Sequence, residues 1–412
     1  MGIDLHKPAA LEEATNSSRP ERWLVISHEA TNSGAPRMLL EILRGVRAAR
    51  GPGWSCEILS RRSGVLADEF ARFGRVHRLS HAWANGSGFW AKVWRALVDR
   101  PWVQPRVLKR HVEKWRKNNF DLIYNNSATN GFVVPALRSL GCPILTHVHE
   151  LGYSLRRFNT STSLKHTLEN SDHFLAVSPA VAADLRECGV AAERITITPN
   201  FLAAMPDGFE EGAQLALRVS LGLPAEASIV TGCGHIDRLK GTDLFVEMAS
   251  SLAKKMDREI LFTWIGGETD PFFAWRVRRL VRRRGLEPRI KFIGAVGNAG
   301  AWFAASDVVA VTSRVESFSL VALEAAAAGR PVVGFAGARG LASVLADEPA
   351  LLIPDFDASL MASTIDDLLR NRPHARALGL RLRSKVAAEF LAGPRIADIL
   401  TVVDKLRVNG RI

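Results

Sequence analysis

Two glutamates, Glu316 and Glu324, stand on either side of the start of an expected helix. The apolar run DVVAVTS (307–313) is typical of a buried strand, and a strong helix former, SLVALEAAAAG, begins at Ser319. The first turn of a helix presents free N–H groups and a partial positive charge, which suit a diphosphate. Glu324 lies about 7–8 Å beyond Ser319 along the helix axis, at ~1.5 Å per residue. One carboxylate could therefore accept hydrogen bonds from a sugar and the other from a ribose, with phosphates between them.

The spacing of the two glutamates does not by itself identify a ligand site, because a surface pair on an amphipathic helix explains it better. The order of elements favours ligand binding: a strand, a loop, a helix, Gly329 suited to cap that helix, and a further strand from Pro331. In open α/β sheets, ligands bind beyond the carboxyl ends of the strands. The backbone amides expected to face such a ligand are those of Phe318, Ser319, Leu320 and Val321.

The elements that must position these residues alternate along the chain as short apolar runs and helix-length amphipathic stretches. Apolar strands that are each followed by a helix are typical of parallel sheets covered on both faces. Some dozen such strands exceed one doubly wound sheet of usual size, so the sequence predicts two sheets in two domains. The expected strands are 23–27, 56–60, 122–127, 143–149, 174–178 and 195–200, followed by 228–234, 261–267, 290–295, 307–313, 331–337 and 351–355.

The boundary between the two domains is expected near 202–225, where Pro, Gly and acidic residues interrupt the alternation. We therefore predict an N-terminal tail over 1–20, a first Rossmann-like domain over 21–203 and a second over 204–385. The remaining segment, 386–412, has a helical pattern and is expected to pack back on the first domain.

The chain is basic, with 54 Lys and Arg against 42 Asp and Glu and a formal net charge of +12. This excess favours an anionic partner, or it is a solvated Arg-rich surface. Two basic segments, 89–120 and 272–285, also carry aromatic residues, and this combination suits peripheral contact with an anionic membrane. The alternative is two amphipathic helices whose tryptophans lie in the core. No nucleic-acid-binding motif accompanies either segment, so no nucleic-acid partner is expected. The tryptophans of the first segment are Trp90, Trp94, Trp102 and Trp115.

Cysteine usage and the N-terminal residues bear on the compartment. The four cysteines are widely spaced and form no CxxC pair, which argues against a zinc site or a disulfide framework. The first residues have no apolar core, so we expect no signal peptide, and no apolar run approaches the ~20 residues of a spanning helix. The sequence therefore predicts a cytoplasmic protein, with the inner face of the plasma membrane as the place of any membrane contact.

The segment ESFSLVALEAAAAGRPVVG (316–334) resembles the signature of the retaining glycosyltransferases of family 4, the glycosyl transferases group 1. That signature is a Glu, seven residues, a second Glu, a small-residue helix, Gly, any residue, Pro and Val-Val. The flanking segment 292–313, which contains Gly294, extends the match, and the resemblance covers most of the chain, strongly over 170–360. It implies a GT-B fold, in which an acceptor-side and a donor-binding Rossmann-like domain, both doubly wound parallel-sheet domains, face an interdomain cleft.

The resemblance implies roles for the matching residues of the donor side. Glu316 would bind hydroxyls of the donor sugar, and Glu324 would bind the ribose of the nucleotide. Backbone amides between them would contact the sugar and the diphosphate; they belong to Ser317, Phe318, Ser319, Leu320 and Val321.

The family also carries Gly-Arg, a short loop and Lys-Gly after the first strand of the donor domain, where the cations neutralise the diphosphate. Here GCGHIDRLKGTDLF (232–245) matches at Lys240 and Gly241, while His235 holds the usual Arg position and Arg238 follows three residues later. A fixed cation is needed because charge develops on the leaving group. As the cation that neutralises the diphosphate, we rank Lys240 first and Arg238 second. One alternative is that Arg238 only caps the loop, and another is that these basic residues are simply solvated.

In the first domain the resemblance implies that His149, which follows the strand PILTHVH, lies near the reacting sugar. His147 is the alternative, and a structural histidine would be the usual reading of such a position. Gly34 and Ala35 stand where the family often has a Gly-Gly pair close to the donor phosphate, and the missing second glycine weakens that contact. Asn200 would lie at the interdomain cleft.

The activity implied is retaining transfer of a sugar from a nucleotide-diphosphate donor to a saccharide or lipid-linked acceptor, in polysaccharide or lipopolysaccharide assembly. The leaving phosphate would accept the proton of the acceptor, and neither a metal nor a cofactor besides the nucleotide sugar is expected. One rival is another nucleotide-sugar enzyme of this fold, an epimerase or a synthase. A second is a non-catalytic, membrane- or nucleic-acid-binding adaptor, which only the departure at His235 supports.

Overall fold

The structure, a computed structural model, describes residues 19–79, 103–152, 161–206, 211–256 and 259–409. Trp90, Trp94 and Trp102, and almost all of the expected N-terminal tail, lie outside the described residues. No helix within the described ranges is long and apolar enough to cross a membrane. The cytoplasmic location expected from the sequence stays a prediction.

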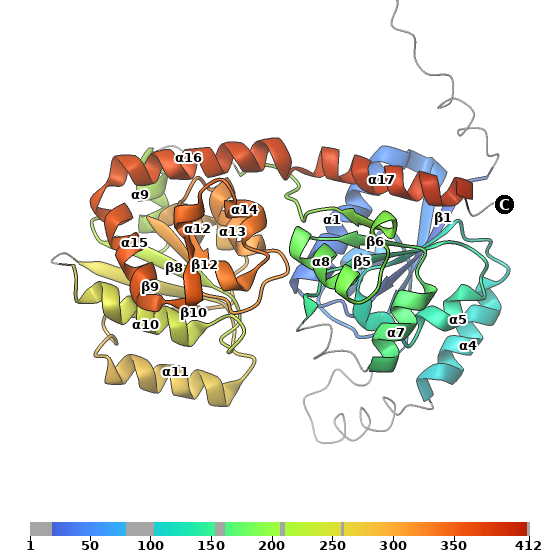
Figure 1. Ribbon diagram of the computed structural model, residues 1–412, viewed down its shortest axis with the longest axis horizontal. Coiled ribbons are helices and arrows are strands. Elements are labelled where there is room, and N and C mark those ends of the chain that lie inside the picture. Colours follow the sequence, from blue (N-terminus) through green and yellow to red (C-terminus); the bar gives the residue numbers. More distant parts are fainter. Residues whose placement is uncertain (1–18, 80–102, 153–160, 207–210, 257–258, 410–412) are drawn as a thin grey trace, which may run out of the picture.

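The first domain is built on a parallel sheet of seven strands in the order β3-β2-β1-β4-β5-β6-β7 (Figure 1). Its strands are β1 (Glu21–Ser27), β2 (Trp54–Ser60), β3 (Gly74–Arg78), β4 (Leu122–Asn125), β5 (Ile144–Val148), β6 (His173–Ala176) and β7 (Ile195–Ile197). Its helices are α1 (Gly34–Arg50), α2 (Ala67–Ala71), α4 (Val103–Trp115), α5 (Val134–Arg138), α7 (Ser161–Asn170) and α8 (Pro179–Glu187). The order reverses after β1, as in a doubly wound dinucleotide-binding sheet.

The second domain repeats this plan with a parallel sheet of six strands in the order β10-β9-β8-β11-β12-β13. Its strands are β8 (Ser228–Cys233), β9 (Ile260–Ile265), β10 (Ile290–Gly294), β11 (Val308–Val311), β12 (Val332–Phe335) and β13 (Leu352–Ile353). Its helices are α9 (Glu211–Ser220), α10 (Thr242–Ala253), α11 (Pro271–Arg283), α12 (Ala299–Ala305), α13 (Leu320–Ala327), α14 (Ala342–Leu345), α15 (Ala358–Arg370) and α16 (Arg372–Glu389). The predicted fold class, two doubly wound parallel-sheet domains, is confirmed.

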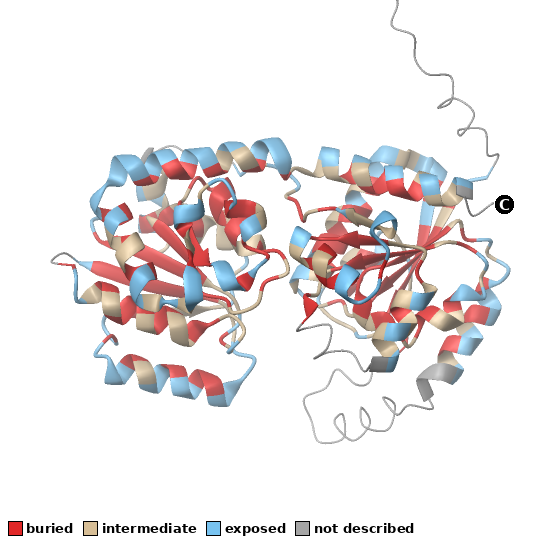
Figure 2. Cartoon of the chain, in the orientation of Figure 1, coloured by how far each residue is buried: buried red, intermediate tan, exposed pale blue. Residues whose placement is uncertain are grey.

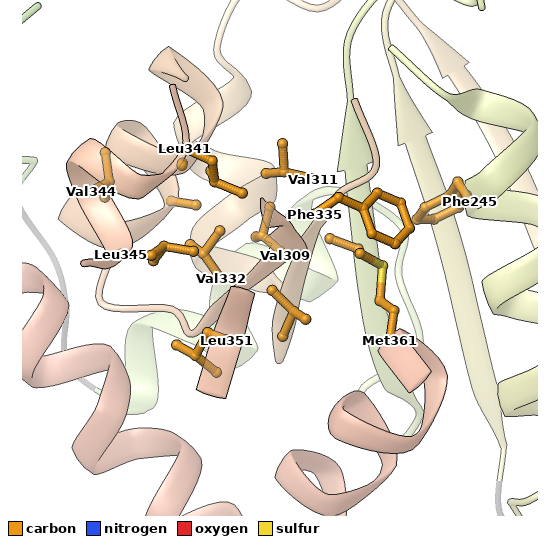
Figure 3. Packing of buried hydrophobic residues seen from close by; sticks show 14 of the residues in the cluster. Phe245, Val309, Val311, Val332, Phe335, Leu341, Val344, Leu345, Leu351 and Met361 are labelled. Carbon is orange, nitrogen blue, oxygen red and sulfur yellow. The ribbon is translucent and has the colours of Figure 1, made fainter. Parts of the chain in front are cut away.

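The strands of both sheets are largely buried (Figure 2), and their apolar side chains pack each sheet against its helices. In the second domain, Val309 and Val311 of β11 and Val332 of β12 lie in one cluster with side chains of the surrounding helices (Figure 3). Leu341, Val344 and Leu345 cover one side of these strands, and Phe245 and Met361 the other. Continuous apolar strands are therefore buried on both faces, as the sequence pattern predicts.

The last helix, α17 (Ala392–Asn409), leaves the second domain and lies on α1 of the first (Figure 1). Ile396, Ile399 and Val403 join the core cluster that includes the buried face of α1. The break between α16 and α17 is held to the interdomain segment, because Leu202 N–H donates to Phe390 O and Ala392 N–H to Leu202 O, at 2.9 and 3.0 Å. The two domains are thus tied together at this crossing.

Candidate active site

The two loops that hold the predicted donor residues meet at the carboxyl ends of adjacent strands β8 and β11. Lys240 Nζ donates to Glu316 Oε1 at 2.7 Å, and Ser313 Oγ donates to the same oxygen at 2.6 Å. The Glu316 side chain is only 8% exposed, whereas that of Lys240 is 29% exposed. Burial disfavours the charged amine, but the adjacent Glu316 carboxylate outweighs it, and the pKa of Lys240 lies above its usual value. Lys240 is therefore charged at neutral pH.

Because both hydrogen bonds reach Oε1, the second carboxylate oxygen of Glu316, Oε2, has no protein partner among the described residues. The backbone of Glu316 is fixed on both sides, since its N–H donates to Ala338 O at 3.0 Å and its carbonyl accepts from Gly340 N–H at 2.9 Å. A rigid carboxylate with one engaged and one open oxygen can accept hydrogen bonds from ligand hydroxyls.

The loop after β8 lies directly against the end of β11. Gly241 has a φ of 66°, and a Cβ added there would lie 1.9 Å from Thr312 O, so only glycine fits. Thr312 Oγ1 donates to Lys240 O at 3.2 Å, and Arg314 binds Asp243 through both guanidinium nitrogens at 2.7 and 2.8 Å. These contacts fix the position of Lys240 relative to Glu316.

Helix α13 begins beside this pair. Ser319 caps it, accepting from Ala322 N–H at 3.2 Å; the helix ends at Ala327, and Gly329, whose φ is 68°, follows the C-cap residue Ala328. No protein acceptor in the described part of the chain meets the five backbone N–H groups from Ser317 to Val321. Five free amides at a helix start, next to a lysine, form an arrangement that binds diphosphates.

The same helix touches the first domain. Arg37 of α1 donates from Nη2 to Glu324 Oε1 at 3.3 Å, and a Cβ on Gly34 would lie 3.6 Å from Leu320 Cδ1. Burial raises the pKa of Glu324, and Arg37 offsets part of this rise. The starts of α1 and α13 therefore meet where the domains meet, and Glu324 lies at this junction.

A second ion pair crosses between the domains. Arg339, whose φ is 63°, donates from Nη1 to Asp184 Oδ1 of α8 at 2.7 Å. Arg339 lies between the two residues that hold the backbone of Glu316. The contact between the domains and the geometry of this carboxylate therefore depend on the same short segment.

His149 follows β5 and belongs to a hydrogen-bonded chain in the first domain. Asn126 Nδ2 donates to Ala35 O at 2.9 Å, so its Oδ1 faces His149 Nε2 at 3.1 Å. A carbonyl oxygen only accepts, hence His149 Nε2 must carry the proton and Nδ1 the lone pair. Burial, with His147 and His28 nearby, lowers the pKa of His149 well below its usual value. The ring is therefore neutral with a defined tautomer.

His147, the alternative to His149, is a core residue. It is 1% exposed, and its Nδ1 lies 2.7 Å from the Tyr124 hydroxyl. Its ring centroid lies 4.3 Å from that of His149. Burial lowers the pKa of His147 from 6.5 to about 3. His147 therefore supports the ring of His149 from the interior.

The low pKa of His147 predicts acid destabilisation. The unfolded chain takes up a proton near pH 6.5 that the folded chain resists down to about 3, so stability present above pH 6.5 falls as pH drops towards 3. We expect this residue to contribute a slope of at most ~1.4 kcal/mol per pH unit in the free energy of unfolding. Denaturant unfolding at several pH values should show a shallower slope for His147→Gln, with His149 supplying the remainder. An unchanged slope would contradict the prediction.

Comparison with known proteins agrees with this geometry. A family model described as Glycosyl transferases group 1 matches residues 227–371, and one described as Glycosyltransferase Family 4 matches residues 33–203. The chain belongs to glycosyltransferase family 4. It is therefore a glycosyltransferase, and the family predicted from 316–334 is confirmed.

Relatives and solved structures of other glycosyltransferases span most of the chain. D-inositol 3-phosphate glycosyltransferase of Jonesia denitrificans is 28% identical over 371 residues, 88% of this chain and 78% of that one. D-inositol 3-phosphate glycosyltransferase 2 of Catenulispora acidiphila is 29% identical, over 63% of this chain and 64% of that one. Anabaena HepE in complex with UDP and glucose has a TM-score of 0.76 at 17% identity, covering 93% and 100%. Sucrose-phosphate synthase from Thermosynechococcus elongatus has a TM-score of 0.75 at 23% identity, covering 94% and 100%. These structural likenesses show the GT-B fold.

The other predicted residues of the glycosyltransferase do not join the hydrogen bonds of this centre. His235 and Arg238 are exposed, and it is the carbonyl of Arg238, not its guanidinium, that accepts from Arg314 at 2.8 Å. Gly294 ends β10, two strands away from β8, and its carbonyl accepts from Gly266 N–H at 2.8 Å. Asn200 is buried after β7 with its Oδ1 unpaired. Within the described ranges, no group of three or more His, Cys, Asp or Glu side chains is arranged to hold a metal ion.

Sequence reasoning missed Arg37, Asn126 and Ser313. Arg37 had a detectable signal, because a cation in the first turn of a helix opposes the helix dipole and calls for a specific anionic partner. Asn126 follows the strand LIYN, but its bonds to Ala35 and His149 join segments far apart in the sequence.

Proposed function

We propose that this glycosyltransferase takes a sugar from a nucleotide-diphosphate donor and transfers it with retention of anomeric configuration. The observation that carries the proposal is the row of free amides from Ser317 to Val321 beside the Lys240–Glu316 pair. In this proposal the diphosphate rests against the amides and Lys240 neutralises its charge. The open oxygen of Glu316 accepts from sugar hydroxyls, and Glu324 accepts from the ribose.

The donor ribose competes with Arg37 for Glu324. The Arg37 side chain is 51% exposed and reaches Glu324 from the other domain at 3.3 Å. On donor binding, the ribose hydroxyls take over the carboxylate and the guanidinium becomes available to the neighbouring diphosphate. Both domains then contact the donor, which excludes water from the reacting bond.

Transfer with retention is a displacement on one face of the sugar. The acceptor oxygen forms a bond to the anomeric carbon while the bond from that carbon to the diphosphate oxygen breaks. The hydroxyl proton of the acceptor passes to the leaving diphosphate. Lys240 and the free amides stabilise the charge that develops there, a contribution of the oxyanion-hole type. The proposal requires neither a metal nor a cofactor besides the donor.

His149 is proposed to contact the donor sugar. Its neutral ring presents Nδ1, which can accept a hydrogen bond from a sugar hydroxyl. Asn126 is a positioning residue, since it sets the tautomer of His149 and ties the ring to Ala35.

Replacing Asn126 with leucine should lower turnover by about 10-fold, the scale of one lost hydrogen bond of about 1–3 kcal/mol. The decisive readout is nitrogen NMR of the imidazole, in which the Nε2–H form of His149 becomes a mixture of tautomers. Tyr124→Phe is the matched control, because it removes the partner of His147 and leaves the His149 bonds intact. If His149 keeps the wild-type tautomer in the Asn126 variant, the proposed positioning role of Asn126 is contradicted.

The acceptor is proposed to be a saccharide or a lipid-linked saccharide, in polysaccharide or lipopolysaccharide assembly, with peripheral contact to an anionic membrane. The basic net charge of +12 supports an anionic acceptor or surface. Two of the relatives named above are D-inositol 3-phosphate glycosyltransferases, so a polyol phosphate belongs in any acceptor panel.

A panel of UDP-, GDP- and ADP-sugars tests the proposal. One donor should raise the thermal unfolding midpoint and be hydrolysed slowly without acceptor, and transfer to an acceptor should give a product of unchanged anomeric configuration by NMR. A chain that no nucleotide sugar stabilises, or a product of inverted configuration, would refute it.

A further inference from the structure

Helix α11 (Pro271–Arg283) carries an exposed surface that combines aromatic and basic side chains. Phe273, Ala274, Val277 and Val281 face the domain core, and buried and exposed residues alternate along the helix (Figure 2). On the outer face, Phe272 is 67% exposed and Trp275 is 52% exposed. Their rings stack, with centroids 5.9 Å apart and an interplanar angle of 23°. The two exposed rings therefore form one continuous apolar patch on the surface of the helix.

Unpaired arginines surround these rings. Residues 271–284 contain six arginines and no acidic residue. Arg278, Arg282 and Arg284 pair with glutamates of neighbouring segments. Arg276, Arg279 and Arg283 have no acidic partner in the part of the chain that the structure describes, and the Arg279 guanidinium lies 5.6 Å from the Trp275 ring centroid. We call Phe272, Trp275, Arg276, Arg279 and Arg283 the α11 surface.

The α11 surface borders a shallow depression of about 360 Å³. The one acidic residue at this depression, Asp243, is already bound by both guanidinium nitrogens of Arg314. The surface therefore presents an excess of positive charge, which is complementary to an anionic partner.

The other basic segment, on α4, has a different construction. Trp115 is 2% exposed, and it stacks with His111 and packs against Phe120. The alternative given above, in which the tryptophans of the basic helices lie in the core, is correct for Trp115 and wrong for Trp275. Of these two helices, only α11 combines exposed aromatic rings with unpaired arginines in the described ranges.

We propose that the α11 surface docks on a bilayer that contains anionic phospholipids. The Phe272–Trp275 pair enters the headgroup region, where tryptophan is favoured, and the three unpaired arginines bind lipid phosphates. An amphipathic helix with Arg on its polar face and aromatic rings beside them is typical of interfacial binding. A nucleic acid fits less well, because Trp275 already stacks with Phe272 and carries Arg279 over its ring, so a base would have to displace one of them.

The first turns of α11, which carry Phe272 and Trp275, follow a segment that pairs with the loop after β8, the loop that holds Lys240 and is called the donor loop below. The segment that leads into α11 pairs with that loop, since Ile236 N–H donates to Gly267 O at 2.9 Å and Ile236 forms a parallel bridge with Glu268. Phe272 and Trp275 are in the first turns after this segment. Docking here holds the donor loop near the membrane surface, where a lipid-linked acceptor lies; this functional consequence alone rests on the proposed function.

Co-sedimentation of the full chain with vesicles tests the docking, with phosphatidylcholine vesicles containing phosphatidylglycerol and vesicles of phosphatidylcholine alone. Binding should require phosphatidylglycerol and weaken as salt rises. Combining Arg276→Gln, Arg279→Gln and Arg283→Gln should weaken binding roughly 100-fold, at ~5-fold for each arginine near an anionic surface. Phe272→Ser with Trp275→Ser should also release the protein. All five side chains lie on the outer face, so the thermal midpoint should not change.

The matched control removes the same charge from the other basic helix, through Lys109→Gln, Arg110→Gln and Lys114→Gln on α4. These side chains are exposed, and this variant should bind as the wild type does. The proposal is overturned if the α4 variant loses binding while the α11 variants keep it, or if phosphatidylcholine alone binds equally well. It is also overturned if the wild type does not bind the vesicles but binds a nucleic acid, and the α11 variants lose that nucleic-acid binding. The assay needs neither donor nor acceptor, so its failure is distinct from a failure of the proposed transfer.

Discussion

Replacing Lys240 with methionine is expected to lower turnover by at least ~10²-fold, the scale of losing one contact that stabilises the transition state. Methionine keeps the apolar stem and removes the amine that reaches Glu316 at 2.7 Å. The charge that develops on the leaving diphosphate then lacks its fixed cation. Turnover with a saturating donor from the nucleotide-sugar panel measures the effect.

The Lys240 variant should also be less stable, because Glu316 is 8% exposed and would lose its cation. Removing one member of a buried ion pair is costly, but Ser313 remains and Lys240 is partly exposed, so a loss of about 1–3 kcal/mol is expected. Activity is therefore compared below the unfolding transition. Lys254→Met, an exposed lysine at the end of α10, is the matched control and should keep full turnover.

Arg238→Gln should have a smaller effect than Lys240→Met. The Arg238 side chain is exposed, and its guanidinium makes none of the hydrogen bonds that join this loop to β11. Near-normal turnover in the Lys240 variant, or a larger loss in the Arg238 variant, would contradict the ranking of the two cations.

The sequence predicted the strands well because parallel strands covered on both faces must be continuous apolar runs. It missed β3, whose residues GRVHR include two arginines and a histidine and are nowhere fully buried. An edge strand pairs on one side only and needs little apolar surface, so hydropathy does not reveal it. The expected strand at 195–200 ends at Ile197, because residues 198–200 belong to the following loop and Pro199 has no N–H to donate to a neighbouring strand.

The candidate site was predictable where it depends on local order and unpredictable where it depends on distant contacts. The free amides from Ser317 to Val321 follow from a strand, a loop and a helix start, all within 307–321. The Arg37–Glu324 contact joins residues 287 positions apart, and no spacing rule connects them. The tautomer of His149 depends on which atoms of Asn126 and Ala35 meet, which only the folded chain determines.

Glu316→Gln is expected to lower turnover by at least ~10²-fold while leaving the affinity for the nucleoside diphosphate nearly unchanged. Glutamine can keep the present contacts, because its carbonyl oxygen accepts from Lys240 and Ser313 as Oε1 does now. The amide nitrogen then takes the position of the open Oε2. The reverse orientation is disfavoured, since it would direct the amide N–H groups at the lysine ammonium. The substitution therefore replaces an acceptor by a donor where the sugar hydroxyls are proposed to bind.

Calorimetric titration with the nucleoside diphosphate and steady-state turnover with the corresponding sugar donor separate the two effects. The diphosphate contacts are assigned to the amides from Ser317 to Val321 and the ribose contacts to Glu324, so the nucleotide should bind the variant about as it binds the wild type. Ser313→Ala is the matched control, because it removes one hydrogen bond to Oε1 and leaves Oε2 open. If nucleotide affinity falls as far as turnover does, the assignment of the open oxygen of Glu316 to the sugar hydroxyls is contradicted, because the glutamine variant retains the contacts of the engaged oxygen and changes only the position of Oε2.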